Sequence, residues 1–341
     1  MKAELKSHEY WMRAALTEAQ KGVGLTRPNP PVGAVVVRRG KIVGRGFHPK
    51  AGKPHAEIYA LSRAGLLARG STLYVTLEPC CTTGRTPPCT EAIIKAGIKR
   101  VVYACVDCNP RHAGRADAIL RRAGIEVIRG VAKDAAATLI RPFAMRVTKG
   151  RPYVTLKLAC TLDGKIADFN GRSKWITGEA SRSVVQELRR TADAIMIGAG
   201  TLRSDNPSLM PRPMRGRNPY RIIIKGKQPL PVGSKVLRDS YAARTKVFEG
   251  SLGLKRIMRE SARLDVMHVV CEGGGVLAEK LLRAGLVDEM WVFYAPKFLG
   301  GTGRVSVAGP GWRLPSAPLF SIIQVRQIGD DLLVRLEKQH V

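Results

Sequence analysis

Residues 76–89 read TLEPCCTTGRTPPC, and together with the HAE triplet at residues 55–57 they decide the fold of the first half of the chain. The run that leads into this stretch is rich in β-branched and apolar residues and predicts a strand that ends before Cys80. We expect Cys80 to begin a helix, where the electropositive N-terminus favours a thiolate. Further helices are expected to begin at Cys89 and at the HAE triplet. The sequence thus predicts a histidine and two cysteines at the ends of helices and strands.

His55, Cys80 and Cys89 are side chains of the types that bind zinc. One imidazole and two thiolates leave the fourth position of a tetrahedral ion open for water, which is typical of a catalytic zinc. A bound zinc lowers the pKa of that water toward ~7 and makes hydroxide available, and Glu57 is suited to carry the proton as the catalytic residue. The order H-x-E, P-C and C is the signature of zinc nucleobase deaminases. The alternative is that the two cysteines are simply buried thiols.

Helices and strands alternate on both sides of this stretch. An amphipathic helix at residues 9–21 and a hairpin at residues 32–44 open the chain. The pattern continues with expected helices at 56–64, 89–96 and 116–123 and expected strands at 72–77, 100–106 and 125–128. This alternation predicts an α/β domain in which helices cover both faces of a sheet, an α/β/α layer.

A basic, proline-broken segment at residues 146–152 separates this pattern from a second one. Residues 203–219, rich in proline and arginine, predict a long functional loop. We therefore expect two domains, residues 1–147 and residues 148–341. The second pattern predicts helices at 180–190 and 276–284 and strands at 153–158, 194–197, 221–224, 266–270 and 290–294.

The composition is that of a globular protein, with 45% hydrophobic and 25% charged residues in 341, which excludes fibrous and largely disordered proteins. No run approaches the ~20 apolar residues of a membrane span, and the start has no apolar signal core, so we expect a cytoplasmic protein without a membrane partner. Seven unevenly spaced cysteines fit a reducing compartment. The net charge of +30 attracts phosphates in general, from nucleic acids to nucleotide-sized metabolites.

The first half resembles the deaminase half of the bacterial bifunctional riboflavin-biosynthesis enzymes. The resemblance rests on PNPPVG at residues 28–33, on TLEPC at residues 76–80, on the GRTPPC insert at residues 84–89 and on DCNP at residues 107–110. It implies a cytidine-deaminase-like fold, one zinc ion per chain and a pyrimidine nucleotide substrate. The residues that the resemblance places around the pyrimidine and the ribose phosphate are Asn29, His48, Arg85, Thr86, Asp107 and Asn109; taken singly, Asn29, His48 and Asp107 also read as turn, surface and loop residues.

The second half resembles the reductase half of the same enzymes. LACTLDGKIA at residues 158–167, SKWITG at residues 173–178 and EGGG at residues 272–275 carry the likeness. A glycine run that enters a helix lets backbone amides approach a phosphate. The resemblance implies a dihydrofolate-reductase-like α/β domain that uses NADPH. It places Cys160, Trp175, Thr201, Asp205, Gly274, Gly275, Val276, Leu277, Ala278, Glu279 and Lys280 at the cofactor, and Ser173, Arg189, Leu209, Arg212 and Glu272 at the substrate.

The resemblance implies that the first half deaminates 2,5-diamino-6-ribosylamino-4(3H)-pyrimidinone 5′-phosphate and that the second half reduces the ribosyl group of the product to ribityl. We expect a homo-oligomer that binds no nucleic acid. Thr82, Met210 and Lys225 depart from the family pattern of a histidine, a threonine and an aspartate, so a relative acting on another aminopyrimidine nucleotide stays an alternative. The net charge alone leaves a second alternative, a nucleic-acid base deaminase, against which the long spacing between Cys80 and Cys89 argues.

Overall fold

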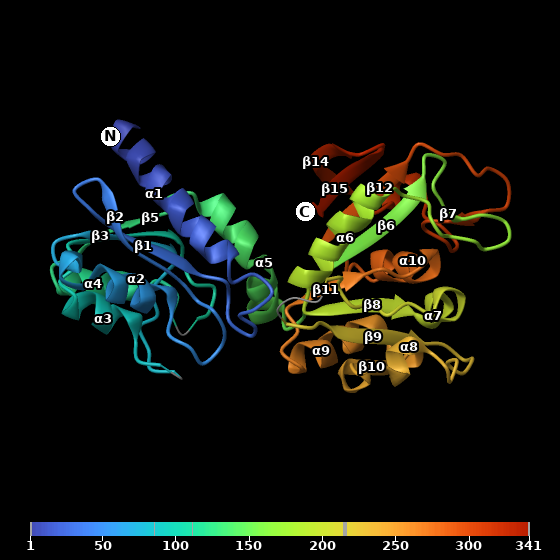
Figure 1. Ribbon diagram of the computed structural model, residues 1–341, viewed down its shortest axis with the longest axis horizontal. Coiled ribbons are helices and arrows are strands. Elements are labelled where there is room, and N and C mark those ends of the chain that lie inside the picture. Colours follow the sequence, from blue (N-terminus) through green and yellow to red (C-terminus); the bar gives the residue numbers. More distant parts are fainter. Residues whose placement is uncertain (1, 85, 111, 214–216, 340–341) are drawn as a thin grey trace. The chain divides into compact units, whose positions relative to one another are not determined.

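The computed structural model describes residues 2–84, 86–110, 112–213 and 217–339 (Figure 1). The chain forms two compact units, Met1–Gly150 and Arg151–Val341. Among the described helices, none is both long and apolar enough to cross a membrane.

The first unit is a five-stranded sheet between two layers of helices (Figure 1). Its strand order is β2-β1-β3-β4-β5, in which β1 runs antiparallel to β2 and β3 whereas β3, β4 and β5 are parallel. α2, α3 and α4 pack on one face of the sheet, and α1 and α5 pack on the other. The elements are α1 (Lys2–Gln20), β1 (Gly33–Arg38), β2 (Lys41–Phe47), α2 (Ala56–Ala64), β3 (Thr72–Leu77), α3 (Cys89–Lys95), β4 (Arg100–Cys105), α4 (Arg115–Arg122), β5 (Glu126–Arg129) and α5 (Lys133–Lys149).

Glycine allows α2 to lie directly on β2. A Cβ atom at Gly46 would stand 2.2 Å from the carbonyl oxygen of Ala56 and 2.6 Å from the backbone nitrogen of Ala60. Only a residue without a side chain permits this approach. The first turn of α2, which carries His55 and Glu57, is therefore seated against the sheet.

The second unit is built on an eight-stranded sheet of order β10-β9-β8-β11-β6-β12-β15-β14. The strands from β10 to β12 are parallel, and β15 and β14 add an antiparallel edge. α9 and α10 cover one face, while α6, α7 and α8 cover the other. The elements are β6 (Tyr153–Thr161), β7 (Lys165–Ala167), α6 (Glu179–Thr191), β8 (Ala194–Gly198), α7 (Ala199–Asp205), β9 (Tyr220–Lys225), α8 (Lys235–Arg238), β10 (Thr245–Glu249), α9 (Leu254–Arg263), β11 (His268–Cys271), α10 (Gly275–Arg283), β12 (Glu289–Ala295), β13 (Arg304–Val305), β14 (Phe320–Ile328) and β15 (Asp331–Lys338).

The layered α/β architecture predicted for both halves is confirmed. Several details differ from the prediction. Residues 203–205 continue helix α7 instead of starting the loop, and β10 and the β14–β15 hairpin are strands that the sequence pattern did not reveal. β10 and β14 are the two edges of the sheet, and most side chains of β14 are exposed, so the apolar pattern that marks a buried strand is weak there.

Candidate functional site

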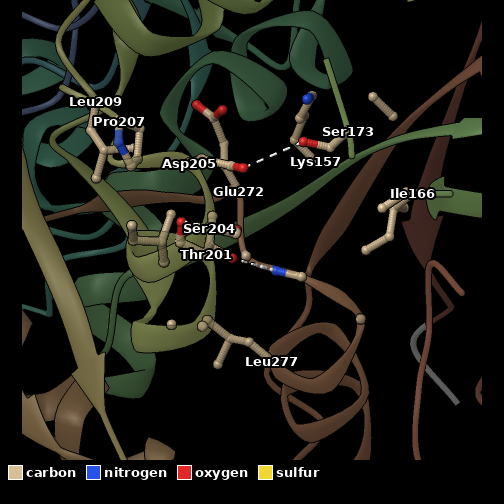
Figure 2. Close-up of a pocket in the computed structure, with 18 of the residues that line it drawn as sticks. Lys157, Ile166, Ser173, Thr201, Ser204, Asp205, Pro207, Leu209, Glu272 and Leu277 are labelled. Atoms are coloured by element: carbon tan, nitrogen blue, oxygen red, sulfur yellow. Dashed lines mark hydrogen bonds between the residues drawn. The ribbon is translucent and has the colours of Figure 1, made fainter. Parts of the chain in front are cut away.

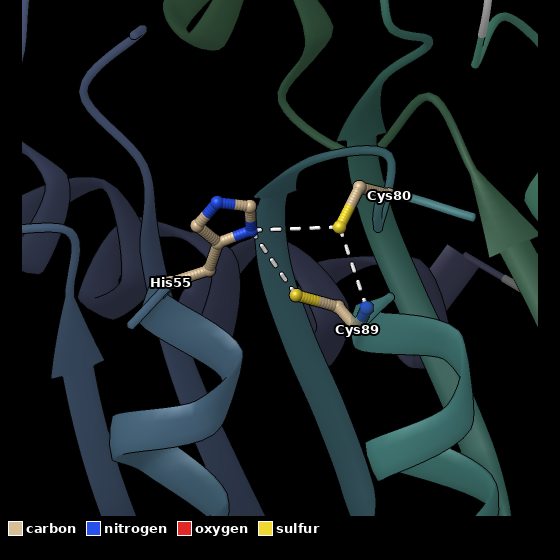
Figure 3. A group of neighbouring side chains, drawn as sticks. All are labelled: His55, Cys80 and Cys89. Atoms are coloured by element: carbon tan, nitrogen blue, oxygen red, sulfur yellow. Dashed lines mark hydrogen bonds between the residues drawn. The ribbon is translucent and has the colours of Figure 1, made fainter. Parts of the chain in front are cut away.

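Three side chains of the first unit converge on one point, which is the metal centre expected from the sequence (Figure 3). The Nδ1 atom of His55 lies 3.3 Å from the Sγ atom of Cys89 and 3.5 Å from the Sγ atom of Cys80. Ligands held at about 2.0–2.3 Å from a tetrahedral zinc ion are themselves roughly 3.5 Å apart. The three atoms therefore fit a zinc ion with one further position for a small ligand.

Cys80 does not begin a helix, and that expectation was wrong. The described residues between the end of β3 at Leu77 and the prolines at 87 and 88 form no helix, and the next helix begins only at Cys89. The sulfur of Cys80 nevertheless accepts the backbone N–H of Cys89 at 3.3 Å, and its carbonyl accepts the N–H of Thr90. The first turn of α3 therefore stabilises the thiolate of Cys80 from across the loop. The helix dipole that we expected to act on Cys80 from its own helix comes from α3 instead.

The electrostatics of the three ligands favour a bound cation. A hydrogen bond with Cys89 lowers the pKa of Cys80 to about 4. The same contact raises the pKa of Cys89 well above its ordinary value, and the hydrogen bond with Cys80 raises the pKa of His55. In the absence of metal one thiolate is thus held by a thiol and an imidazole. A divalent cation would satisfy both sulfurs as thiolates.

Glu57 stands in the first turn of α2, beside these ligands. Its side chain is buried at 3% exposure and makes a hydrogen bond with the side chain of Cys89. Burial raises the pKa of Glu57 above its ordinary value. A carboxyl group that holds and releases a proton at the metal centre is what general acid–base catalysis requires.

Asn29 and His48 join the metal centre from the loops around β1 and β2. Asn29 Nδ2 lies 3.0 Å from His48 Nε2, and the Nδ1 atom of His48 lies 3.1 Å from the carbonyl oxygen of Pro54. The rings of His48 and His55 meet edge to face with centroids 5.3 Å apart. Burial lowers the pKa of His48, so a neutral ring is favoured. The structure therefore brings these two predicted substrate residues to the predicted ligands.

A buried carboxylate that the sequence analysis did not single out, Glu78, fixes the loop of Asp107 and Asn109. It accepts the backbone N–H groups of Asp107 at 3.1 Å, of Gly114 at 2.9 Å and of Ala116 at 3.0 Å. Asp107 in turn accepts the backbone N–H of Asn109 at 2.8 Å. No motif signals this role of Glu78, because its partners lie 29 or more residues further along the chain.

The insert between Cys80 and Cys89 contains two of the predicted substrate residues, Arg85 and Thr86. Arg85 lies outside the described residues. The carbonyl of Thr86 accepts the N–H of Gly84 at 3.1 Å, a contact within the loop itself. Thr82, one of the departures, lies 3.4 Å from Nδ1 of His112, so an imidazole stands beside this position although Thr82 itself is not a histidine.

The second unit contains a cavity of about 1540 Å³ along the carboxyl ends of its parallel strands (Figure 2). Small-molecule sites are commonly about 300–1,000 Å³, so this cavity has room for a dinucleotide together with a second ligand. Its wall includes most of the residues predicted for cofactor and substrate: Ser173, Trp175, Arg189, Thr201, Asp205, Leu209, Arg212, Glu272, Gly274, Gly275, Val276, Leu277 and Lys280.

Two hydrogen bonds, both drawn in Figure 2, order the middle of this cavity. Thr201 Oγ1 accepts the backbone N–H of Gly274 at 3.1 Å, which joins the start of α7 to the glycine run before α10. Ser173 Oγ donates to Asp205 Oδ1 at 3.4 Å. The glycine run is thereby held at the N-terminus of α10, where backbone amides favour a phosphate.

Three predicted cofactor residues do not line the cavity. Cys160 and Ala278 are buried in the hydrophobic core, at 1% and 0% exposure. The carboxylate of Glu279 forms an ion pair with Arg283 on the next turn of α10. Their assignment therefore stays a prediction that the cavity does not support.

Lys157 is a further wall residue that the sequence analysis missed. Its side chain comes from β6, and burial lowers the pKa of Lys157 while Glu272 works in the opposite sense. The signal in the sequence was a single lysine inside the otherwise apolar run YVTLKLAC. A half-buried lysine with a shifted pKa in a ligand cavity is a candidate for a functional role.

Comparison with known proteins identifies a family match for each of the two units. Residues 5–105 match the cytidine and deoxycytidylate deaminase zinc-binding region, and residues 152–334 match the RibD C-terminal domain. The riboflavin biosynthesis protein RibD of Aquifex aeolicus is 43% identical over 95% of this chain and 96% of its own length.

Two solved structures share the whole architecture. Acinetobacter baumannii RibD, form 1, superimposes with a TM-score of 0.91 at 38% identity, over 98% of this chain and all of its own. The second structure has a TM-score of 0.92 at the same identity and coverage. It is the diaminohydroxyphosphoribosylaminopyrimidine deaminase/5-amino-6-(5-phosphoribosylamino)uracil reductase of Thermotoga maritima. With a zinc-binding deaminase region and a reductase domain in this order, the chain belongs to the RibD family of bifunctional deaminase/reductases of riboflavin biosynthesis.

Proposed function

We propose that the first unit, residues 1–147, deaminates 2,5-diamino-6-ribosylamino-4(3H)-pyrimidinone 5′-phosphate. The second, residues 148–341, then reduces the ribosyl group of 5-amino-6-ribosylaminouracil 5′-phosphate to ribityl with NADPH. The observation that carries the proposal is the convergence of His55, Cys80 and Cys89 beside the buried carboxyl of Glu57. One zinc ion per chain, a small-molecule substrate, a cytoplasmic location and assembly into a homo-oligomer complete the proposal.

The residues of the first unit divide the work of deamination. A zinc ion bound by His55, Cys80 and Cys89 would make a water molecule acidic enough to react near neutral pH. Glu57 takes a proton from the water and returns one to the amino group that leaves, so that a C–O bond forms, a C–N bond breaks and ammonia departs. Asn29 offers amide donors and acceptors to the edge of the base.

In the second unit, NADPH supplies a hydride and the protein supplies position and a proton. The glycine run before α10 is suited to the phosphates of the dinucleotide. Lys157 lies in the cavity wall, and its pKa is lowered by burial, so it is suited to donate a proton to the ring oxygen O4′ of the ribosyl group while the hydride adds to C1′ and the C1′–O4′ bond breaks. Orientation of the two ligands does the rest.

The test is a pair of assays on one preparation, ammonia release and NADPH oxidation. We expect Glu57→Gln to retain zinc, as measured by metal analysis, to lose deamination by at least about a hundredfold, and to reduce the deaminated substrate normally. A zinc-loaded wild-type protein that releases no ammonia from this pyrimidine would overturn the substrate assignment. Equal loss of both activities in Glu57→Gln would contradict separate sites.

A second candidate substrate deserves a comparison because Thr82 lies against His112. A hydroxyl and an imidazole at this position could serve another aminopyrimidine nucleotide. Turnover of such nucleotides beside the riboflavin intermediate separates the two candidates, and a higher kcat/KM for another nucleotide would favour the second.

A further inference from the structure

A segment that follows β12 covers the cavity of the second unit beside the glycine run. It comprises residues 297–308, includes the short strand β13, which pairs with β7, and ends against the first residue of α10. We name residues 297–308 the strap. Four of its residues line the cavity, namely Gly303, Arg304, Val305 and Ala308. The reduction proposed above does not use the strap.

The end of the strap lies directly on the glycine run. The backbone N–H of Ala308 donates to the carbonyl oxygen of Gly275 at 3.1 Å. A Cβ atom at Gly275 would stand 2.4 Å from the carbonyl oxygen of Val305, so this approach requires glycine. Arg304, the neighbour of Val305 in the chain, is therefore held close to the N-terminus of α10, where a phosphate is expected.

Asp163 fastens the start of the strap to the turn between β6 and β7. Its carboxylate accepts the backbone N–H groups of Leu299 at 3.2 Å and of Gly300 at 2.7 Å. The hydroxyl of Thr161 also donates to it at 2.5 Å, and this hydrogen bond is the main reason why the pKa of Asp163 is lowered. Because Asp163 holds two consecutive amides of the strap, it fixes the position at which the strap crosses the turn.

The strap is also joined to the loop that carries Trp175. The Nζ atom of Lys297 donates to the carbonyl oxygens of Trp175 at 3.1 Å and of Ile176 at 2.8 Å. Trp175 and Gly275 are both residues that we predicted at the cofactor. The strap thus connects two separate parts of the expected dinucleotide site.

Arg304 is the cation that the strap brings to the cavity wall. A Cβ atom at Gly171 would lie 2.9 Å from Nη2 of Arg304, so the guanidinium lies against the loop that leads to Ser173. Within the described part of the chain no carboxylate pairs with Arg304, whereas Arg189 is held by Glu272. A guanidinium without a carboxylate partner keeps its planar fork of donors for phosphate oxygens.

We propose that the strap belongs to the dinucleotide site, with Arg304 as a further phosphate-binding residue and Asp163 as the residue that positions it. The inference rests on the NADPH-dependent reduction proposed above. In this assignment the phosphates of the dinucleotide lie between the backbone amides at the start of α10 and the guanidinium of Arg304. The attraction between a solvent-exposed guanidinium and a phosphate is screened by salt, which distinguishes this contact from a purely structural role of the strap.

Calorimetric titration of the full chain with NADP⁺ tests the role of Arg304. We expect Arg304→Ala to weaken binding about tenfold or more, and Arg304→Lys, which keeps the charge and loses the planar fork, to weaken it less. The difference between Arg304→Ala and wild type should shrink as the ionic strength rises from about 0.01 M to about 1 M. Arg313→Ala removes an exposed arginine beyond the strap and outside the cavity wall, so it is the matched control and should bind NADP⁺ as wild type does.

A double-mutant cycle with the same titration tests the positioning role of Asp163. Asp163→Ala removes the acceptor of both strap amides and should weaken NADP⁺ several-fold, and Asp163→Asn, which keeps one acceptor oxygen, should have a smaller effect. In the Arg304→Ala background, Asp163→Ala should add less than about twofold, because the residue that it positions is gone. The KM for NADPH of Asp163→Ala should rise while kcat at saturating NADPH stays within about twofold of wild type.

The assignment of Arg304 is overturned if wild type and Arg304→Ala bind NADP⁺ equally, if Arg313→Ala weakens binding as much, or if the effect of Arg304→Ala does not change with salt. Each of these results leaves the NADPH-dependent reduction standing, provided that wild type binds NADP⁺. Effects of Asp163→Ala and Arg304→Ala that simply multiply would refute the positioning role. Wild-type protein that binds no NADP⁺ would refute the strap assignment together with the NADPH-dependent reduction.

Discussion

Arg189 and Glu272 hold each other by two parallel hydrogen bonds in the wall of the reductase cavity. Arg189 Nε donates to Glu272 Oε1 at 2.6 Å and Nη2 donates to Oε2 at 2.8 Å, with the side chains 13% and 9% exposed. Both residues were predicted to bind substrate. Because each already has a charged partner, a substrate phosphate at Arg189 would meet only the guanidinium donors that Glu272 leaves free, and the carboxylate is fixed in one orientation.

We predict that breaking this pair from one side destabilises the protein more than removing it. Arg189→Met leaves a carboxylate buried without its cation and is expected to cost about 3 kcal/mol of unfolding free energy. The double variant Arg189→Met/Glu272→Leu is expected to recover part of that loss. Urea denaturation measures both unfolding free energies, and a double variant no more stable than Arg189→Met would contradict the coupling.

The pair also predicts how stability depends on pH. Burial alone would raise the pKa of Glu272, but the charge of Arg189, its hydrogen bonds and the charge of Lys157 together outweigh burial, and the pKa lies below the ordinary 4.5. A lowered pKa in the folded state contributes stability above pH 4.5, and this contribution is lost as the pH falls through the folded value. The stability difference between wild type and Glu272→Gln should therefore shrink under acid conditions. A difference independent of pH would show that the charge of Glu272 is not involved.

Lys157 is predicted to be required for reduction and not for deamination. Lys157→Met keeps the length of the side chain and removes the proton donor, so kcat of reduction should fall by about a hundredfold or more while ammonia release is unchanged. In the wild type, reduction should slow as the pH rises through the lowered pKa of Lys157, because only the protonated amine can donate. Lys255→Met, on the exposed side of α9, is the control. Normal reduction by Lys157→Met would exclude the role.

The metal centre could be predicted from the sequence because its four residues follow each other in one short, ordered pattern. Buried strands such as β3 and β11 could also be predicted, from the pattern of their apolar residues. Glu78 and Lys157 could not be assigned, because their roles depend on partners that only folding brings near, such as the N–H of Gly114 and the carboxylate of Glu272. The local sequence pattern predicts the helices, the strands and the ligands of a motif. Contacts between residues far apart in the sequence decide which of the remaining polar side chains have a role in the site.

Glu78 is predicted to position the substrate loop of the deaminase. Glu78→Gln replaces one acceptor oxygen by an amide donor that faces backbone N–H groups, which should cost about 1.5–3 kcal/mol of unfolding free energy. Hydrogen exchange at Asp107, Gly114 and Ala116 should accelerate, and KM of deamination should rise more than kcat falls. Glu126→Gln, in an exposed pair with Arg100, should leave all of these unchanged. Unaltered exchange at the three amides would refute the positioning role.

Gly46 is predicted to set the position of the metal ligand His55 through the packing of α2. The Cβ atom of Gly46→Ala would meet the Ala56 carbonyl at 2.2 Å, and because this is backbone, α2 itself must move. Overpacking of this kind costs about 1–3 kcal/mol. Zinc affinity should fall together with stability, since the displaced turn carries both the histidine and Glu57. Gly233→Ala, where an added Cβ meets nothing within 4 Å, is the control, and a Gly46→Ala protein that keeps wild-type zinc affinity would show that the ligands adjust independently of α2.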